Sequence, residues 1–424
     1  MEKQIYNQYL QILREELVPA MGCTEPIAIA YAAALARQAL GRMPERVAVK
    51  ASANTIKNVK SVVVPHTGEL RGIAAAVSAG IVAGRAEDQL QVLSYVTQEE
   101  IGKIASFLKE REITVEPSDA PYVFDIQIRV YAEEDCAFCQ IAGHHTNVVC
   151  LSRNGEILRK NPYEEQVATN KADRAILNIA DIVTFADEVD LADVEETIQR
   201  QIDCNTAIAK EGLSGAWGAS IGKVLLAAYG NDVHTRAKAM AAAGSDARMS
   251  GCEMPVVINS GSGNQGLTTS LPVIVYAEDM GVSKETLYRA LVLANLTTIH
   301  LKTGIGTLSA YCGATSAGCG AGAGICYLHG GKCDEVAHTI VNALAINSGM
   351  ICDGAKASCA AKIASAVEAG LLGWQMQTHG SEFFGGEGIV TKGVENTIRN
   401  VGRVAKNGMV DTDREIIEIM ISSC

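Results

Sequence analysis

Apolar residues recur along the chain with two different periods, and the period changes twice. A helical period opens the chain over residues 3–18, where one apolar face contains Ile5, Tyr9, Ile12, Leu13 and Leu17. A second helix is predicted from about residue 25, and the small-residue run at 68–84 predicts another. Between them, the β-branched residues of 46–65 predict a strand pair or a strand–loop–strand.

The period shortens in the middle of the chain. Strict alternation over 123–130 predicts a half-buried strand, and Asn-Gly at 154–155 predicts a hairpin turn. An acidic helical stretch follows over 187–199, and the chain then returns to Ala- and Gly-rich helical segments. We therefore expect an α+β fold, in which a mainly helical domain (1–98 and 199–424) carries a small inserted α+β domain (99–198).

Composition narrows the class of protein. The 424 residues are 48% hydrophobic but only 5% aromatic, and 40 are glycine, which is typical of closely packed helices. The net charge is −12 and no basic stripe occurs, so nucleic acid is not an expected partner. No uninterrupted apolar run has membrane-spanning length, and the first ten residues do not resemble a signal peptide. We expect a cytoplasmic protein without a membrane partner, and a homodimer.

The segment "MGCTEP" places a thiol at the start of the second predicted helix. Thr24 can cap the helix, and proline is tolerated in its first turn. Cys23 then lies just outside the positive end of the helix dipole, where a thiolate is favoured. The alternative is a capped core helix with a small, inert buried cysteine.

Thirteen cysteines in a chain without a secretory signal are more typical of metal binding or thiol chemistry than of disulfides. "CAFCQIAGHH" offers Cys136, Cys139, His144 and His145 as zinc ligands. The segment alternates like a strand, however, and the two histidines are adjacent instead of three to five residues apart. A non-catalytic zinc or thiol protein built on this segment remains one alternative.

A glycine-rich loop follows the apolar run at 256–258. "NSGSGNQG" begins at Asn259 and leads into a predicted helix, so its backbone N–H groups can form an anion site. The spacing matches neither a Walker loop nor a dinucleotide fingerprint. Its amide side chains favour a small carboxylate or an amino acid, and a simple polar turn is the alternative.

Six further cysteines lie toward the C-terminus. Four follow every seventh residue (Cys312, Cys319, Cys326 and Cys333), a spacing too extended along a helix for all four to reach one metal. Cys352 and Cys359 flank an Asp-Gly-Ala-Lys turn, so they can converge where two helices meet. One of the four together with this pair would supply three thiolates, enough to hold a cubane cluster and leave one iron open.

Five separated motifs together resemble one family over essentially the whole chain: "MGCTEP", "SANTIKNVKSVVVPHTG", "INSGSGNQG", "IHLKTGIGTLSAYCG" and "GMICDGAKASC". The family is that of L-cysteine desulfidase, which is related to the alpha subunit of iron–sulfur L-serine dehydratase. The resemblance implies a 4Fe–4S cluster held by Cys312, Cys352 and Cys359. It also implies that Cys23 is the catalytic base.

The implied reaction is β-elimination from L-cysteine without pyridoxal phosphate, giving sulfide, pyruvate and ammonium. We expect Asn259, Ser260 and Gly261 to hold the substrate carboxylate, and Asn54 and His66 to bind the amino or carboxylate group. His300 and Lys302 have two alternative roles: they contact the substrate, or they are solvent-exposed residues at the end of a helix.

The chain departs from the serine dehydratases in the shorter gap between Cys352 and Cys359. It ends, as they do, in a cysteine (Cys424) that in those enzymes can occupy the open iron. The nearest alternative function is dehydration of L-serine or another hydroxy-amino acid at the same cluster.

Overall fold

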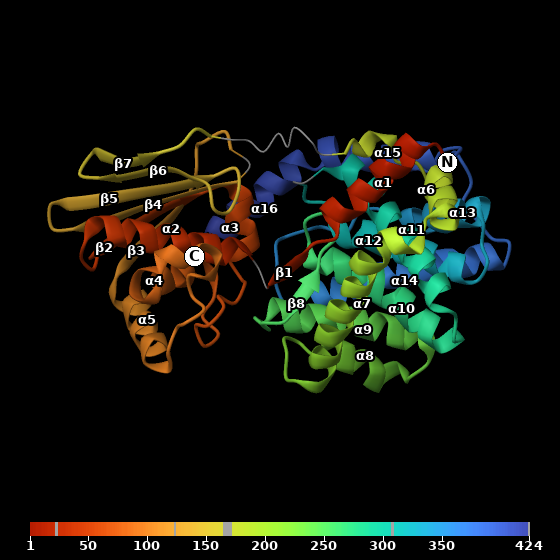
Figure 1. Ribbon diagram of the computed structural model, residues 1–424, viewed down its shortest axis with the longest axis horizontal. Coiled ribbons are helices and arrows are strands. Elements are labelled where there is room, and N and C mark those ends of the chain that lie inside the picture. Colours follow the sequence, from red (N-terminus) through yellow and green to blue (C-terminus); the bar gives the residue numbers. More distant parts are fainter. Residues whose placement is uncertain (22–23, 123, 164–171, 307–308, 423–424) are drawn as a thin grey trace.

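The computed structural model describes residues 1–21, 24–122, 124–163, 172–306 and 309–422. Helices and a single larger sheet separate into two groups, which lie at opposite ends of the molecule in Figure 1. We call them the sheet lobe and the helical lobe. The arrangement confirms the predicted α+β class with a mainly helical larger part.

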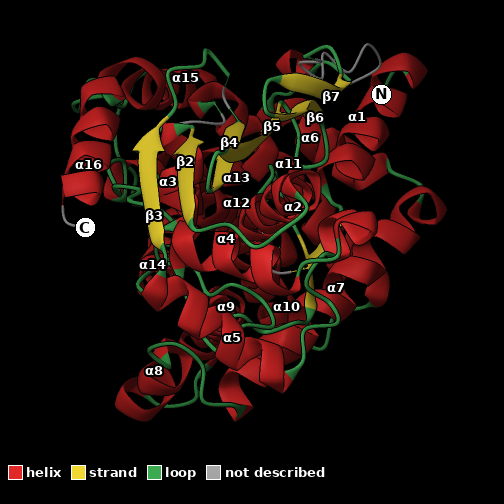
Figure 2. Cartoon of the chain, turned by 90° about the vertical axis from the view of Figure 1, so that its left-hand side faces the viewer, coloured by secondary structure: helices red, strands yellow, loops and turns green. Residues whose placement is uncertain are grey.

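The sheet lobe contains a six-stranded sheet in the order β3-β2-β4-β5-β6-β7. Strands β2 and β3 are parallel, and the other neighbours are antiparallel. Figure 2 looks at the molecule from this side, with β2 and β3 standing next to each other. The elements of the lobe are α2 (Thr24–Leu40), β2 (Arg46–Ala51), α3 (Ala53–Val59), α4 (Gly72–Ala83), η1 (Ala86–Gln91), α5 (Gln98–Glu110), β3 (Glu112–Pro117), β4 (Asp125–Ala132), β5 (Asp135–Ala142), β6 (Val148–Arg153) and β7 (Glu156–Lys160).

The helical lobe contains the first helix and everything after the sheet. Its elements are α1 (Lys3–Glu16), β1 (Pro19–Met21), η2 (Arg174–Ile176), α6 (Ile179–Glu188), α7 (Leu191–Ser214), α8 (Ile221–Tyr229), α9 (Val233–Met249), β8 (Pro255–Val257), α10 (Gly263–Met280), α11 (Lys284–Ile305), α12 (Gly313–Leu328), α13 (Cys333–Ile346), α14 (Cys359–Thr378), α15 (Val394–Arg403), η3 (Val404–Gly408) and α16 (Val410–Ser422). The short strand β1 pairs with β8 in a separate antiparallel ladder.

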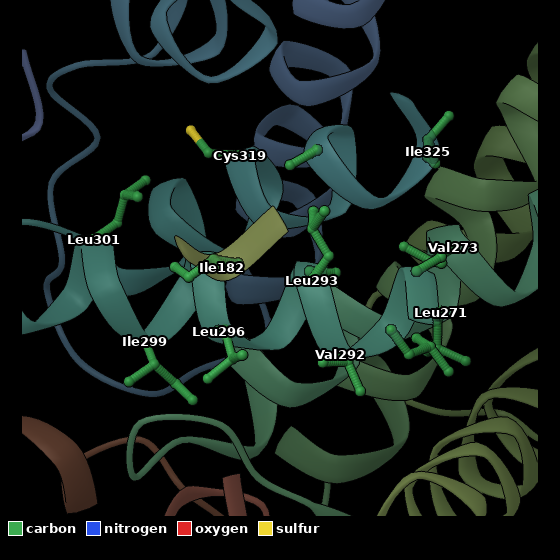
Figure 3. Packing of buried hydrophobic residues seen from close by; sticks show 14 of the residues in the cluster. Ile182, Leu271, Val273, Val292, Leu293, Leu296, Ile299, Leu301, Cys319 and Ile325 are labelled. Atoms are coloured by element: carbon green, nitrogen blue, oxygen red, sulfur yellow. The ribbon is translucent and has the colours of Figure 1, made fainter. Parts of the chain in front are cut away.

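Helix α12 lies at the centre of the helical lobe, packed against α10, α11, α13 and α14. Small residues allow this crowding, because a Cβ on Gly318 would fall 2.1 Å from the carbonyl oxygen of Ala366 in α14. Branched side chains fill the remaining space, as Figure 3 shows for Leu271 and Val273 of α10, Val292 and Leu296 of α11, and Ile325 of α12.

Two hydrophobic cores group the residues differently from the predicted 99–198 insertion. One core joins residues 27–93 to 104–148, and the other joins residues 9–17 to 172–405. The reason is that α2 buries its Ala-rich face on the sheet and α4 packs on α2, while α6 packs on α11 and α7 packs on α9 and α10. The domain boundary itself stays a prediction.

Local predictions had different outcomes. The first two predicted helices are confirmed by α1 and α2, and the Asn-Gly hairpin by the β6–β7 turn, where Asn154 and Gly155 both have positive φ. The expected strand pair at 46–65 is wrong after residue 51, where α3 follows β2. Ser52 and Thr55 share a hydroxyl hydrogen bond of 2.9 Å at the start of this helix, a local bond that favours the turn over a strand.

Candidate active site

Cys312 and Cys352 are brought together by a short antiparallel bridge between Tyr311 and Ile351. The backbone N–H of Cys312 donates to Met350 O at 2.9 Å, and that of Cys352 donates to Ala310 O at 2.6 Å. The two cysteines are 40 positions apart in sequence, and this backbone pairing fixes their proximity. Cys312 stands immediately before α12.

Cys359 joins this pair from the start of α14. The segment between the two cysteines turns at Gly354, whose φ of +92° is a left-handed conformation that favours glycine. The Cys359 thiol donates to the carbonyl oxygen of Gly354 at 3.6 Å. Because α12 packs along α14, the N-terminal ends of both helices lie beside the thiols, and their dipoles favour thiolates.

The first two thiols interact directly. A hydrogen bond from Cys312 lowers the pKa of Cys352 and raises that of Cys312, so the proton stays on Cys312. Burial raises the pKa of Cys359, although Lys356 and Lys362 oppose that rise. Among the described cysteines of this region, these three influence one another electrostatically.

Lysine side chains surround the three thiols. Lys57 and Lys362 act on Cys352 and lower its pKa further. Burial lowers the pKa of Lys302, and the thiols of Cys352 and Cys312 oppose that change. Lys362 also pairs with Asp353 at 2.5 Å, and Lys356 pairs with the same carboxylate. The lysines therefore favour negative charge on Cys352 and oppose the effect of burial on Cys359.

The other cysteines of the seven-residue series lie elsewhere. Cys319 and Cys326 are buried inside α12, where burial raises their pKa values to about 12 and about 11, respectively. Cys333 begins α13. Two of these thiols are thus core residues inside α12 and the third starts α13, which leaves Cys312 as the member of the series that meets Cys352 and Cys359.

Helix α3 of the sheet lobe closes the cysteine loop from the other side. The backbone oxygen of Lys57 would lie 2.0 Å from a Cβ on Gly354, so the two chains are in close contact. The Lys57 ammonium group pairs with Asp413 of α16 at 2.5 Å. Asn54 precedes Lys57 by three residues and so lies on the same side of α3.

The proposed base, Cys23, lies outside the described residues, as does Cys424. The flanking segments are described: β1 ends at Met21 and pairs with β8, and α2 begins at Thr24. Glu25 accepts a hydrogen bond from the Asn58 side chain of α3 at 3.4 Å. The start of α2 is thereby tied to the helix that contacts the cysteine loop.

His145, which the sequence analysis considered only as a zinc ligand, contacts the start of α2. Its Nε2 lies 3.3 Å from the Thr24 hydroxyl, and its ring packs against Phe124 with centroids 4.6 Å apart. Burial lowers the pKa of His145, and the nearby Glu25 opposes this, so the ring is held mainly neutral. The adjacent histidines were a signal in the sequence. They were considered as zinc ligands together with Cys136 and Cys139, and not as partners of Thr24.

The strand context explains why those partners do not assemble. Cys136 and Cys139 are three residues apart on β5, and so point to opposite faces of the sheet. Burial strongly raises the pKa of Cys139. Over the described ranges, no three His, Cys, Asp or Glu side chains are arranged to share a single metal ion.

His66 has left-handed backbone geometry (φ 58°), and its Nδ1 lies 3.0 Å from Glu253 Oε1. Glu253 lies two residues before the start of β8. The contacts thus place His66 at the junction between the lobes, beside the β1–β8 ladder. No hydrogen bond given for the described residues joins it to the three thiols.

The glycine-rich loop is held by a buried amide network. Asn259 is fully buried, and its Nδ2 donates to Asn295 Oδ1 at 2.9 Å, while its Oδ1 accepts from Ser260 Oγ at 2.9 Å. Ser260 and Gly261 have φ values of 49° and 77°. The Asn259 side chain is therefore fully used in shaping the loop, and the backbone of Ser260 and Gly261 is what the loop presents.

This loop leads into the neighbourhood of the thiols. Ser262 caps α10, and Gln265 in the first turn of α10 packs against Gly313, the residue after Cys312. His300 and Lys302 separate: His300 pairs with Glu395 at 2.7 Å, whereas Lys302 faces Cys312 and Cys352. The structure brings the loop, the three cysteines and α3 to one seam between the lobes.

The chain belongs to the serine dehydratase alpha chain family, whose model matches residues 87–418. The predicted relationship to the iron–sulfur serine dehydratases is thus confirmed at the level of the family.

None of the helices in the described ranges is long and apolar enough to cross a membrane.

Similar proteins extend this relationship over the full length. A UPF0597 protein of Desulfitobacterium hafniense is 56% identical, and the match covers 100% of this chain and 99% of the relative. A UPF0597 protein of Lachnoclostridium phytofermentans is 46% identical over 99% of this chain and 100% of its own. One from Vibrio campbellii is 36% identical over 98% and 99%, respectively.

Proposed function

We propose that this protein is an iron–sulfur lyase that eliminates the β-substituent of an amino acid, with L-cysteine as substrate. The observation that carries the proposal is the meeting of Cys312, Cys352 and Cys359 among lysines at the seam between the lobes. Family membership supports the lyase class, because the family is described as that of the serine dehydratase alpha chain.

The donor set fits a 4Fe–4S cluster. Three thiols are present, two at helix starts, and Lys57, Lys302 and Lys362 compensate negative charge around them. In such clusters each thiolate binds a different iron, so the three sulfurs need not converge on one ion. When bound, the cluster would supply an iron without a protein ligand that acts as a Lewis acid toward the leaving sulfur.

The chain's own residues would bind and deprotonate the substrate. Backbone N–H groups of Ser260, Gly261 and the start of α10 would hold the carboxylate at the positive end of that helix. Asn54 and His66 would contact the substrate from the sheet lobe. Cys23 would remove the α-proton, and His145 would orient the start of α2 through its contact with Thr24.

The overall reaction balances without a redox partner. The α-proton and the β-thiolate leave L-cysteine together as hydrogen sulfide, and the remaining aminoacrylate tautomerises to an imine. Water then replaces the imine nitrogen, which gives pyruvate and ammonium. L-serine is the second candidate substrate, because the family is described by that activity.

The test is an assay of protein reconstituted anaerobically with iron and sulfide. We expect sulfide and pyruvate from L-cysteine, and about four irons per chain. Turnover of L-serine without turnover of L-cysteine would contradict the substrate proposal but retain the class.

Matched serine variants test the ligand set. Cys312→Ser, Cys352→Ser and Cys359→Ser should each lose iron and activity. Cys333→Ser is the control, because Cys333 also begins a helix and is partly exposed but belongs to α13. Equal iron content in all four variants would contradict the proposed ligands.

A further inference from the structure

Gln265 contains a buried amide oxygen for which no hydrogen-bond donor is found in the described part of the chain. The residue is only 5% exposed, and its Oε1 is completely shielded from solvent. Its Nε2 makes a long hydrogen bond of 3.5 Å to Ser260 O, which orients the amide. Buried polar atoms are nearly always paired in folded proteins, so an unpaired acceptor at this place requires an explanation.

The unpaired oxygen lies beside the first thiol of the site. A Cβ on Gly313 would fall 2.7 Å from Gln265 Oε1, and Gly313 directly follows Cys312. Ser316 lies three residues after Gly313 and so on the same side of α12. The Ser316 hydroxyl is also buried and without a partner among the described residues.

A neutral oxygen acceptor without a donor in the described chain therefore lies against the start of α12, and a buried hydroxyl without a partner follows it on the same side of that helix. An ammonium group offers three N–H donors, one of which would satisfy the Gln265 oxygen. In an α-amino acid the ammonium and carboxylate groups share one carbon, so their binding groups must be neighbours. Gln265 contacts the backbone of Ser260, the loop residue that we assign to the carboxylate.

We infer that Gln265 binds the α-ammonium group of the substrate and so makes the site select amino acids over carboxylic acids that lack the amino group. This inference rests on the proposed function, and it adds a binding residue that the proposed reaction does not itself require. Gln265→Leu should abolish this selection, because leucine keeps the approximate volume but offers no acceptor.

The test compares two pairs of ligands on the reconstituted holoenzyme. Each pair differs only in the amino group: L-cysteine against β-mercaptopropionate, and L-serine against β-hydroxypropionate. Dissociation constants are measured by competitive inhibition and by ligand-induced shifts in melting temperature. In the wild type we expect a preference of roughly 10- to 100-fold for the amino acid of the pair that binds.

In Gln265→Leu we expect that preference to fall to within about threefold, with the affinity for the deaminated ligand unchanged. Gln265→Glu keeps an acceptor oxygen and should retain the preference. Persistence of the preference in Gln265→Leu would overturn the inference, as would equal weakening of both ligands. If the wild type neither binds nor turns over an amino acid, the proposed function itself fails, and this inference fails with it.

Stability provides a readout that does not depend on ligand. Because Oε1 has no donor in the described chain, Gln265→Leu gives up only the long hydrogen bond of 3.5 Å from Nε2 to Ser260 O, and it should melt close to the wild-type temperature. The matched control is Gln201→Leu, since the Gln201 amide is also buried but exchanges hydrogen bonds of 2.7 and 3.0 Å with Asn295. That control should melt lower. A Gln265→Leu protein destabilised as much as the control would show that the amide is structural.

Discussion

The chemical environment of each thiol in this protein depends on its position relative to the start of a helix. Cys312 and Cys359 stand at the N-terminal ends of α12 and α14, where the helix dipoles favour a thiolate, and the nearby lysines oppose the rise that burial causes in the pKa of Cys359. Cys319 lies two turns inside α12, and burial raises its pKa to about 12. The same residue type is thus a ligand candidate at the start of a helix and an inert core residue inside it.

Gly354 is the residue on which the cysteine loop most depends. Gly354→Ala would place a Cβ 2.0 Å from Lys57 O at a φ of +92°. We expect a loss of about 1–3 kcal/mol in the free energy of unfolding and reduced iron incorporation. Urea unfolding and iron analysis check both.

Gly386→Ala is the control, because its φ is +109° but nothing lies within 4 Å of the added Cβ. It should show the backbone cost with normal iron content. Equal iron content in the two alanine variants would contradict a special role for the Gly354 turn.

Site residues were predictable where a local signal marked them. The Asp-Gly sequence at 353–354 predicted the turn between two cysteines, and the Gly-rich segment predicted the loop at Asn259. The contact of His145 with Thr24 was not predicted because the two residues are 121 positions apart. A long-range contact of this kind leaves no trace in local spacing.

Among the elements, α12 depends on residues without bulky side chains. Gly318→Ala would force a Cβ to 2.1 Å from Ala366 O, so α12 and α14 would have to separate. We expect a loss of about 2–4 kcal/mol in the free energy of unfolding, measured by urea denaturation.

Gly102→Ala in α5 is the matched control. This glycine is also inside a helix, but it is exposed, and nothing lies within 4 Å of the added Cβ. The substitution should stabilise the protein by about 0.5–1 kcal/mol, because alanine is the better helix former. A similar loss in both variants would contradict the close-packing argument.

Helices α9 and α14 are also joined by a charged contact. A hydrogen bond from His234 lowers the pKa of Glu368 to about 2 despite burial, with help from Lys238. In the unfolded chain a glutamate titrates near 4.3. The contact therefore stabilises the fold fully above that value, and the stabilisation is lost as the pH falls toward about 2.

Glu368→Gln removes this contribution. The difference in the free energy of unfolding between wild type and variant should be largest near neutral pH and should shrink as the pH falls from about 5 to about 2. Urea unfolding at a series of pH values measures it. A difference that does not change over this range would refute the assignment.

Helices were predictable where the amphipathic segment was long, as in α1. The prediction failed for α3, which has only seven residues. There the β-branched residues Thr55, Ile56 and Val59 favoured a strand. Burial of four of its side chains against neighbouring elements outweighed that propensity.

At the scale of the whole molecule, the candidate site lies at a seam, which the ion pair between Lys57 and Asp413 crosses. Lys57 of α3 is 4% exposed in its side chain, and its partner Asp413 of α16 is 19% exposed. Asp413→Asn would leave a buried ammonium group without its counter-charge. We expect a loss of roughly 2–4 kcal/mol in the free energy of unfolding, checked by urea denaturation.

The double variant Lys57→Met with Asp413→Asn should recover part of this loss, because no charge is then left buried. Additive losses in the double variant would show that the two groups do not interact.

The homodimer expected from the sequence stays a prediction.

The division into cores could not be read from composition. Residues 27–93 have the same Ala- and Gly-rich character as the later helices, yet they cover the sheet. Composition indicates how closely helices can pack, but it does not indicate which elements they pack against. The local pattern therefore predicted the fold class, whereas the grouping of segments depended on long-range contacts.

Helix α1 has a consequence for synthesis on the ribosome. Its buried residues Tyr9, Ile12 and Leu13 belong to the core built from residues 172–405. Helix α1 is therefore made before the sheet lobe but packs on α7 and α11, which are made after it. During translation its apolar face stays uncovered until those helices follow.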